Sequence, residues 1–380
     1  MEVALLDAAA AQVQAEAWTE AKLLAEEAVH RIWDRLHLGK WSEVDVVWRK
    51  RFATACHLLA QCQVATTTDV AGAISTLDTG LLMAGPYGSV LHELMELLLE
   101  QVPEPTTPFD CGIKRHCFHP TYEHVALYPI PGCATGIECI DPPPLSVFHD
   151  TYMRPRRPVV IRGAMTHWPA MGGHRSWANL DYLKRVAGMR TVPIEIGSSY
   201  LDDDWSQTLM PLSQFIDEHV TTTSAAKGYL AQHALFEQIP QLRRDICIPD
   251  YCALSDDCTD EDDDEVVVNA WFGPANTISP LHFDPAHNLL CQVVGRKYLR
   301  LYAPTQSHEM YPVEGLLQNT SQVKVEAVDH EAFPSFGSAP YIECTLHPGD
   351  MLYLPPRFWH FVQALDVSFS VSCWYAQPKS

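Results

Sequence analysis

The sequence of 380 residues predicts an α+β protein, with a small all-helical N-terminal domain before a larger β-rich domain. Up to about residue 99 the chain is rich in Ala and Leu, nearly free of proline, and apolar at helical spacing. After residue 147 it consists of short β-rich segments between Gly and Pro turns, which indicates a barrel or a sandwich. The expected parts are a helical domain at 1–100, a linker at 101–146 and a catalytic domain at 147–380.

The helical domain shows apolar residues on one face of each expected helix. Leu24, Ala28, Ile32 and Leu36 follow a helical period. A second stripe ends the domain and is typical of ordinary core packing; it comprises Leu91, Leu94, Met95, Leu98 and Leu99. We find no convincing period of the length that helical repeats show, so the sequence predicts no repeat array. We expect this domain to dock a protein partner.

The linker is defined by proline and also holds cysteine. Nine prolines lie between residues 103 and 144, where they remove backbone donors and favour extended conformations. Cys111, Cys117, Cys133 and Cys139 lack the paired spacing of structural zinc sites, which favours free cysteines over a metal site. The N-terminus has no basic region followed by an apolar stretch, so we expect reduced thiols and a nuclear or cytoplasmic location.

A formal net charge of -21 restricts the classes of partner. Binding of nucleic acid needs clustered Lys and Arg, so direct nucleic-acid binding is not expected. An acidic surface attracts basic or arginine-containing protein segments, although the same charge also serves solubility alone. No apolar run reaches the roughly 18–20 residues that span a bilayer, so no membrane association is expected.

The β-rich domain contains several recognisable strands and two helical insertions. We expect strands at 158–161, 192–196, 265–269 and 369–372, since each is rich in β-branched or aromatic residues. We expect helices at 177–186 and 212–219.

Two histidines and one carboxylate of this domain form a candidate metal site. His282 and Asp284 are two residues apart, so in an extended segment both side chains point to the same face. His360 follows 78 residues later, after a Pro-Gly turn and an apolar strand. This set is the facial triad of non-haem Fe(II), which leaves positions open for a chelating 2-oxo acid and for oxygen. The pair alone is also compatible with ordinary surface polar residues.

Lys297 supports the catalytic interpretation. In the strand after the turn at 295–296, Lys297 shares a face with Leu299 and Leu301. If this face lines the barrel, the ammonium needs an anion, which the distal carboxylate of 2-oxoglutarate would supply. The alternative is a lysine at a strand end that extends to water.

Several motifs resemble those of the Jumonji-C oxygenases and follow in the same order. They are residues 157–163 (RPVVIRG), 271–274 (WFGP), 279–285 (SPLHFDP), 295–298 (GRKY) and 348–360, which ends in Trp-His. The resemblance covers roughly residues 148–375 and implies a double-stranded β-helix, the cupin or Jumonji-C barrel. Residues 184–241 are similar to the members that have a helical N-terminal region and hydroxylate arginine side chains.

The resemblance also implies roles for individual residues. It assigns iron to His282, Asp284 and His360, which are the catalytic residues, with 2-oxoglutarate and O2 as cosubstrates. Its 2-oxoglutarate site comprises Tyr229, Ser279, Asn288 and Lys297, with Trp374 close by. Its substrate pocket comprises Glu195, Trp205 and Trp271. A carboxylate and two indole faces suit a planar guanidinium, which predicts oxidation of an arginine side chain, at C3 by resemblance.

Other interpretations stay open at this point. Histone methyl-lysine demethylation uses the same iron chemistry and differs in the shape of the pocket. A non-catalytic chromatin-associated scaffold would need neither the triad nor Lys297. Each Trp of the pocket is also compatible with plain core packing. Phe283, between the two ligands, departs from the polar residue expected there, and its side chain should point away from iron.

Overall fold

The structure is a computed structural model that describes residues 1–39, 43–102, 134–197, 205–222, 227–255 and 265–376. Contacts between residues divide the chain into two compact units. The helical unit comprises residues 1–112, 187–192 and 209–214, and the β-rich unit comprises 113–186, 193–208 and 215–380. Of the four linker cysteines considered above, Cys111, Cys117 and Cys133 lie outside the described residues.

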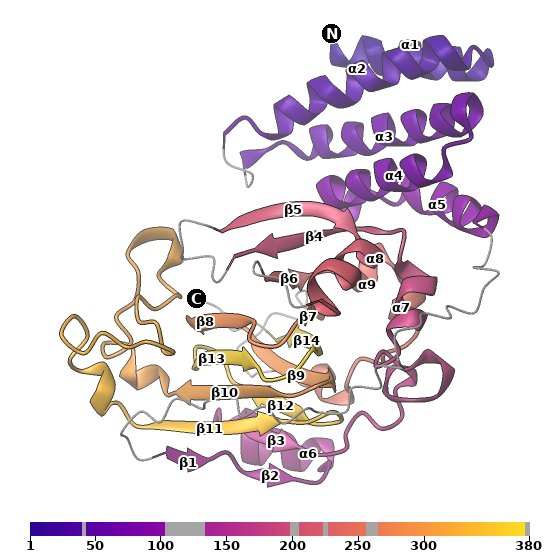
Figure 1. Cartoon of the computed structure of the whole chain (residues 1–380). Coiled ribbons are helices and arrows are strands. Elements are labelled where there is room, and N and C mark those ends of the chain that lie inside the picture. Colours follow the sequence, from indigo (N-terminus) through magenta and orange to yellow (C-terminus); the bar gives the residue numbers. More distant parts are fainter. Residues whose placement is uncertain (40–42, 103–133, 198–204, 223–226, 256–264, 377–380) are drawn as a thin grey trace. The chain divides into compact units, whose positions relative to one another are not determined.

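Within the described residues up to 102, the helical unit contains five α-helices (Figure 1), where apolar periodicity predicts helical structure. They are α1 (Glu2–Gln14), α2 (Trp18–Leu36), α3 (Val46–Thr67), α4 (Val70–Ala84) and α5 (Val90–Gln101). Aspartates begin two of them, because Asp45 accepts a hydrogen bond from the Val47 amide and Asp69 from the Gly72 amide. Each side chain satisfies a backbone donor that has no partner within the helix.

Small residues let these helices approach one another closely. Ala21, Ala25 and Ala28 of α2 are fully buried. At Gly80 of α4, an added Cβ would lie only 2.8 Å from Leu91 and 2.9 Å from Cys56. A side chain there would push α4 away from α3 and α5, so glycine is required by packing.

Two segments distant in sequence complete the helical unit. Residues 187–192 and 209–214 are joined by backbone hydrogen bonds, from Leu212 to Arg190 and from Ser213 to Gly188. Arg190 donates to Asp78 of α4 through Nη2, at 2.7 Å, and through Nε, at 3.1 Å. The Thr191 amide donates to the other carboxylate oxygen at 2.7 Å. Because Asp78 and Arg190 are 0% and 1% exposed, this is a buried and well-bonded ion pair.

The β-rich unit contains two sheets made mostly of antiparallel strands (Figure 1). The five-stranded sheet has the order β1 (Ala134–Gly136), β11 (Tyr341–Leu346), β10 (Lys297–Tyr302), β13 (Trp359–Ala364) and β8 (Ile278–His282). The other has the order β2 (Cys139–Ile140), β3 (Val159–Ile161), β12 (Met351–Leu354), β9 (His287–Val294), β14 (Ser368–Tyr375), β7 (Val267–Gly273), β6 (Gly228–His233), β4 (Thr191–Ile196) and β5 (Ser206–Pro211). Both sheets contribute to one apolar cluster, with Leu299 and Leu346 from the first and Leu290 and Leu352 from the second. The predicted α+β fold with a C-terminal barrel is confirmed.

The helices of this unit are short and differ slightly from the predicted ranges. They are α6 (Leu145–Phe148), α7 (Leu180–Ala187), α9 (Leu235–Gln238) and α10 (Pro240–Arg243). A further short helix, α8 (Leu212–Phe215), falls mostly in the segment 209–214 of the helical unit, which also includes the start of β4 and the end of β5. The helix expected at 212–219 is α8 followed by a π-helical turn at Ile216–Val220. Among the residues described, no helix is long and apolar enough to cross a membrane.

Candidate functional site

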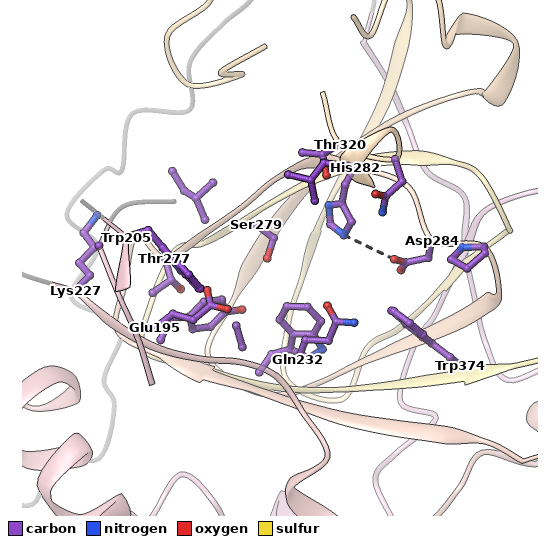
Figure 2. A pocket seen from close by; sticks show the side chains of 18 residues that line it. Glu195, Trp205, Lys227, Gln232, Thr277, Ser279, His282, Asp284, Thr320 and Trp374 are labelled. Carbon is purple, nitrogen blue, oxygen red and sulfur yellow. Dashed lines mark ion pairs between the residues drawn. The ribbon is translucent and has the colours of Figure 1, made fainter. Parts of the chain in front are cut away.

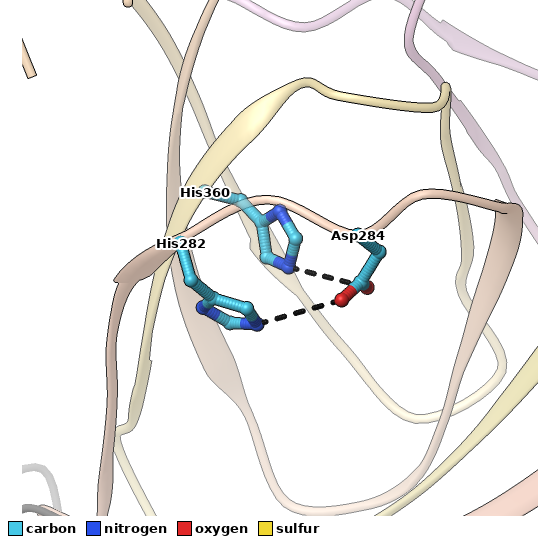
Figure 3. A group of neighbouring side chains, drawn as sticks. All are labelled: His282, Asp284 and His360. Atoms are coloured by element: carbon cyan, nitrogen blue, oxygen red, sulfur yellow. Dashed lines mark ion pairs between the residues drawn. The ribbon is translucent and has the colours of Figure 1, made fainter. Parts of the chain in front are cut away.

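Three side chains converge where β8 ends (Figure 3). His282 is the last residue of β8 and faces His360 of β13 in the antiparallel register. Asp284 follows two residues after His282 and faces the Nε2 atoms of both imidazoles: its carboxylate oxygens are 3.8 Å from His282 Nε2 and 3.7 Å from His360 Nε2. The ligand atoms all lie within 4.8 Å of one another, so one metal ion can contact all three. Within the described ranges this is the one such cluster of His, Cys, Asp and Glu.

Backbone carbonyls orient both imidazoles. His282 Nδ1 is bonded to the Pro280 carbonyl at 2.7 Å, and His360 Nδ1 to the Phe358 carbonyl at 2.9 Å. A carbonyl only accepts, so each Nδ1 carries the proton and each Nε2 presents its lone pair to a metal. Burial, followed by the nearby His282, lowers the pKa of His360 to about 4, which keeps this ligand neutral at physiological pH.

The triad borders two cavities that share Trp271, Ser279, His282 and Asp284. The larger, of about 270 Å³, extends from the triad toward Glu195 and Trp205 (Figure 2). The smaller cavity is lined by the triad and also by Lys297 and Asn288. All the site residues named from the sequence line one or both cavities; they are Glu195, Trp205, Tyr229, Trp271, Ser279, His282, Asp284, Asn288, Lys297, His360 and Trp374.

Lys297 is buried at the end of the smaller cavity. It is 3% exposed, so the alternative of a lysine that extends to water is wrong. Its Nζ lies 3.3 Å from the Tyr229 hydroxyl, which also forms a hydrogen bond with Ser279. Burial without an anion lowers the pKa of Lys297 to about 7. Lys297, Tyr229 and Ser279 therefore form a connected group of donors in which burial is the one effect on the Lys297 ammonium and no carboxylate of the described residues offsets it.

Two further polar atoms near this space are buried without a partner. Asn288 Oδ1 and Trp374 Nε1 make no hydrogen bond with any described residue, although Asn288 Nδ2 donates to Asp284 at 3.3 Å. Buried polar groups in native proteins are nearly always satisfied, so these atoms indicate a ligand. A dicarboxylate that chelates a metal at the triad and reaches Lys297 fits the N–H and O–H donors of this site, among them Trp374 Nε1, whereas Asn288 Oδ1 is an acceptor and is not satisfied by a carboxylate.

The larger cavity holds the predicted substrate residues. Glu195 lies on β4 opposite Tyr229 of β6. Burial raises the pKa of its carboxyl, and a hydrogen bond from Trp205 opposes that shift. Trp271 donates to the Ser372 hydroxyl at 2.9 Å, and its ring lies 5.9 Å from Lys297 Nζ, so this indole faces both cavities. The far end of the larger cavity therefore combines a partly buried carboxylate with indole surface.

Phe283 points away from the triad, as expected. Its ring packs edge-on against Trp359 at 4.9 Å between centroids, and the Arg357 guanidinium lies 4.9 Å from its centroid. It lines neither cavity. The apolar side chain therefore belongs to the outer core of the five-stranded sheet.

The sequence analysis missed several residues that line the larger cavity. They include Lys227, Gln232, Thr277, Asn319 and Thr320. Gln232 has a φ of 44° and lies where the pairing of β6 with β7 shifts register between Leu230 and His233. Bulges of this kind redirect side chains and are not visible in hydrophobic periodicity. A single Lys or Gln beside a β-rich segment carries no signal in the sequence alone.

Two family models match the chain. Residues 144–380 match a cupin-like domain, and residues 7–107 match the KDM8-like N-terminal ARM repeats. The prediction that the helical domain lacks repeats is therefore wrong. In a short array the repeats share a packing pattern rather than identical residues, so α1 to α5 show apolar stripes without an obvious period.

Similar proteins of known name cover most of the chain. It is 42% identical to lysine-specific demethylase 8 of Danio rerio over 90% of this chain and 85% of that protein. It is 38% identical to lysine-specific demethylase JMJ30 of Arabidopsis thaliana, over 93% and 85% of the two chains. It is 36% identical to Jumonji C domain-containing protein 5 of Drosophila melanogaster, over 94% and 87%. The chain therefore belongs to the Jumonji-C family of cupin-like oxygenases.

Proposed function

We propose that this protein is an Fe(II)- and 2-oxoglutarate-dependent oxygenase that oxidises a cationic side chain of a protein substrate. The observation that carries the proposal is the triad of His282, Asp284 and His360 beside a cavity that ends at the buried Lys297. When bound, iron and 2-oxoglutarate supply the activation of oxygen, with formation of succinate and carbon dioxide and insertion of oxygen into a C–H bond.

The chain itself supplies binding and orientation. The two Nε2 atoms and the Asp284 carboxylate would hold iron on one side, leaving the side toward the cavities open. Lys297, Tyr229 and Ser279 would bind the distal carboxylate of 2-oxoglutarate. Trp374 would contribute its unpaired buried indole N–H, and Asn288, which lines the smaller cavity, would lie beside the cosubstrate. These groups position the reactants and exclude water rather than transfer protons.

Glu195 supports a cationic substrate. A carboxylate whose pKa is raised by burial gains most from a positive partner, and the neighbouring indoles of Trp205 and Trp271 can contact a cation through their faces. A net charge of -21 favours a basic segment around the target residue. The helical unit is a candidate for docking the protein that carries this segment.

Two substrates meet these requirements. The names of the relatives favour oxidative demethylation of methyl-lysine over arginine hydroxylation, so demethylation is the first candidate. Arginine hydroxylation is the second, because a carboxylate can accept two parallel hydrogen bonds from a guanidinium, whereas a methylated ammonium offers fewer donors. A scaffold without activity is disfavoured by the intact triad.

A matched peptide series tests the proposal. Peptides with one basic sequence would carry arginine, lysine or methyl-lysine at the central position and be incubated with enzyme, Fe(II), ascorbate and 2-oxoglutarate. We expect loss of a methyl group from the methyl-lysine peptide, by mass spectrometry, and its suppression by Glu195→Gln. Gain of one oxygen by the arginine peptide, with methyl-lysine unchanged, would select the second candidate. If no peptide is oxidised and no succinate forms above the substrate-free level, the proposal is wrong.

We expect Lys297→Met to weaken 2-oxoglutarate binding by about 30-fold or more, because truncating one partner of a buried charge pair typically costs about 2–5 kcal/mol. Binding of Mn(II), a redox-inert substitute for Fe(II), should change little, since Lys297 is no ligand of the metal. Anaerobic calorimetry measures both affinities. Lys324→Met, at an exposed lysine that lines neither cavity, is the matched control. Equal 2-oxoglutarate affinity in the two variants would refute the assignment of Lys297.

The affinity for 2-oxoglutarate should also fall as the pH rises above about 7. Lys297 has a pKa of about 7 before the anion binds, and pairing with a carboxylate raises that pKa. Below pH 7 the lysine is already charged, whereas above it binding must take up a proton, so affinity decreases by up to about tenfold per pH unit. Calorimetry at pH 8 in buffers of different ionisation enthalpy measures this uptake. No uptake, or an uptake retained in Lys297→Met, would contradict the prediction.

A further inference from the structure

Lys227 is a charged group of the larger cavity to which the site described above gives no role. It precedes β6 and lines the cavity together with Glu195, Trp205 and Thr277, on the side away from His282 and Asp284 (Figure 2). Its Nζ donates to the backbone carbonyl of Asn276 at 2.9 Å. An ammonium has three protons to donate, so two remain directed elsewhere.

The Lys227 ammonium is partly desolvated, and among the residues that the structure describes it has no anionic partner. Burial lowers the pKa of the Lys227 ammonium, and no carboxylate of the described residues lies near enough to raise that pKa again. Glu195, the carboxylate of the same cavity, is bonded instead to Trp205. A partly buried ammonium without a counter-charge is unfavourable, and the cavity is open to a ligand that supplies one.

Apart from the triad residues, the larger cavity is lined by one acidic and one basic side chain. Glu195 offers a negative group and Lys227 a positive group that are not paired with each other. A substrate with only a cation would satisfy Glu195 and leave Lys227 facing its uncharged part. A substrate that also has an acidic group at a short distance would satisfy both.

We propose that Lys227 is a specificity-determining residue that binds a carboxylate of the substrate close in sequence to the oxidised cationic residue. This inference rests on the proposed function and adds a second recognition element to it. The carboxylate belongs either to an Asp or Glu side chain or to the C-terminus of the substrate. Both sources offer the same oxygen acceptors to the ammonium. The substrate would then carry an acidic group next to the oxidised residue, within a segment that is otherwise basic.

A purely structural role for Lys227 is the competing explanation. The bond to the Asn276 carbonyl holds the turn that leads into β8, and Asn276 has a φ of 65°, in the left-handed region. A lysine that only stabilises this turn would affect all substrates equally. A lysine that binds a carboxylate would affect acidic substrates selectively.

The test compares charge at single positions of the substrate. Peptides with the target residue fixed carry Asp at successive flanking positions, each matched by Asn, and a further pair ends in a free or an amidated C-terminus. Dissociation constants and kcat/KM are measured for the wild type, Lys227→Met, Lys227→Arg and the control Lys324→Met.

For one acidic position we expect a preference over the matched amide of about 10- to 100-fold in the wild type, mainly through KM, as for a hydrogen bond to a charged group. Lys227→Met should reduce this ratio to about one, and Lys227→Arg should restore most of it. No preference in the wild type, or the same preference in Lys227→Met, overturns the proposal. Because binding is measured separately, peptides that bind with this preference but are not oxidised would refute the proposed function and leave the role of Lys227 standing.

Discussion

Asp284→Ala should abolish turnover while leaving the β-rich unit folded. The carboxylate is the one anionic ligand of the triad and faces both imidazoles, 3.8 Å and 3.7 Å from their Nε2 atoms. Changing a group that only supports a metal ligand already lowers metal affinity or activity by about 10- to 100-fold, so removal of a ligand should exceed that range. Succinate formation and Mn(II) binding, measured on the same preparation, check the result.

The control for this variant is His347→Ala. His347 is a largely exposed histidine of the same unit that lines neither cavity. It should retain full activity, and circular dichroism should show both variants folded. A folded Asp284→Ala protein that binds Mn(II) and oxidises substrate as the wild type does would remove Asp284 from the metal site.

Asp78→Ala should destabilise the helical unit by about 3–5 kcal/mol, which is typical when one partner of a buried ion pair is removed. Arg190 is 1% exposed and would be left with an uncompensated charge, and the Thr191 amide would lose its acceptor. Hydrogen exchange measured by mass spectrometry on peptides of α3 and α4 reports on this unit alone. Exchange there should become faster by two orders of magnitude or more, as the opening free energy falls.

Two variants serve as controls for this effect. Asp366→Ala removes the partner of Arg296, whose side chain is 24% exposed. The free energy of unfolding of the β-rich unit, which contains this pair, should fall by about 1 kcal/mol or less. The double variant Asp78→Leu with Arg190→Met replaces the buried pair by apolar groups and should recover most of the stability. Unchanged exchange in Asp78→Ala would show that water or another group compensates the Arg190 charge.

The sequence predicted those parts of the molecule that depend on local periodicity or on fixed spacing. His282 and Asp284 were assigned to one face because an extended segment has a period of two, and the same rule placed Lys297 on one face with Leu299 and Leu301. His360 was assigned as the third ligand from its place after a Pro-Gly turn and an apolar strand, and the family resemblance implied the same role; no local rule by itself brings residues 78 apart to one point.

Other features were invisible for physical reasons. Residues 187–192 and 209–214 pack with the helices through tertiary contacts, above all that of Arg190 with Asp78, and nothing near Arg190 in the sequence indicates such a partner. The ARM repeats were missed because their helices share shape rather than residue identities. Lys227 was missed because a single lysine reveals its surroundings only in the folded chain.

Because the helical unit is assembled from three separate stretches of the sequence, a cut in the backbone between two of these stretches leaves its tertiary contacts in place. A single cut of the backbone between residues 112 and 187 would break the covalent link between the five helices and Arg190. The hydrogen bonds that Arg190 and Thr191 make with Asp78 would remain. The two fragments would share one folded unit, each holding part of its core. A nicked protein would then behave as a complementing pair, which co-purifies until it is denatured and can reassemble from separately produced halves.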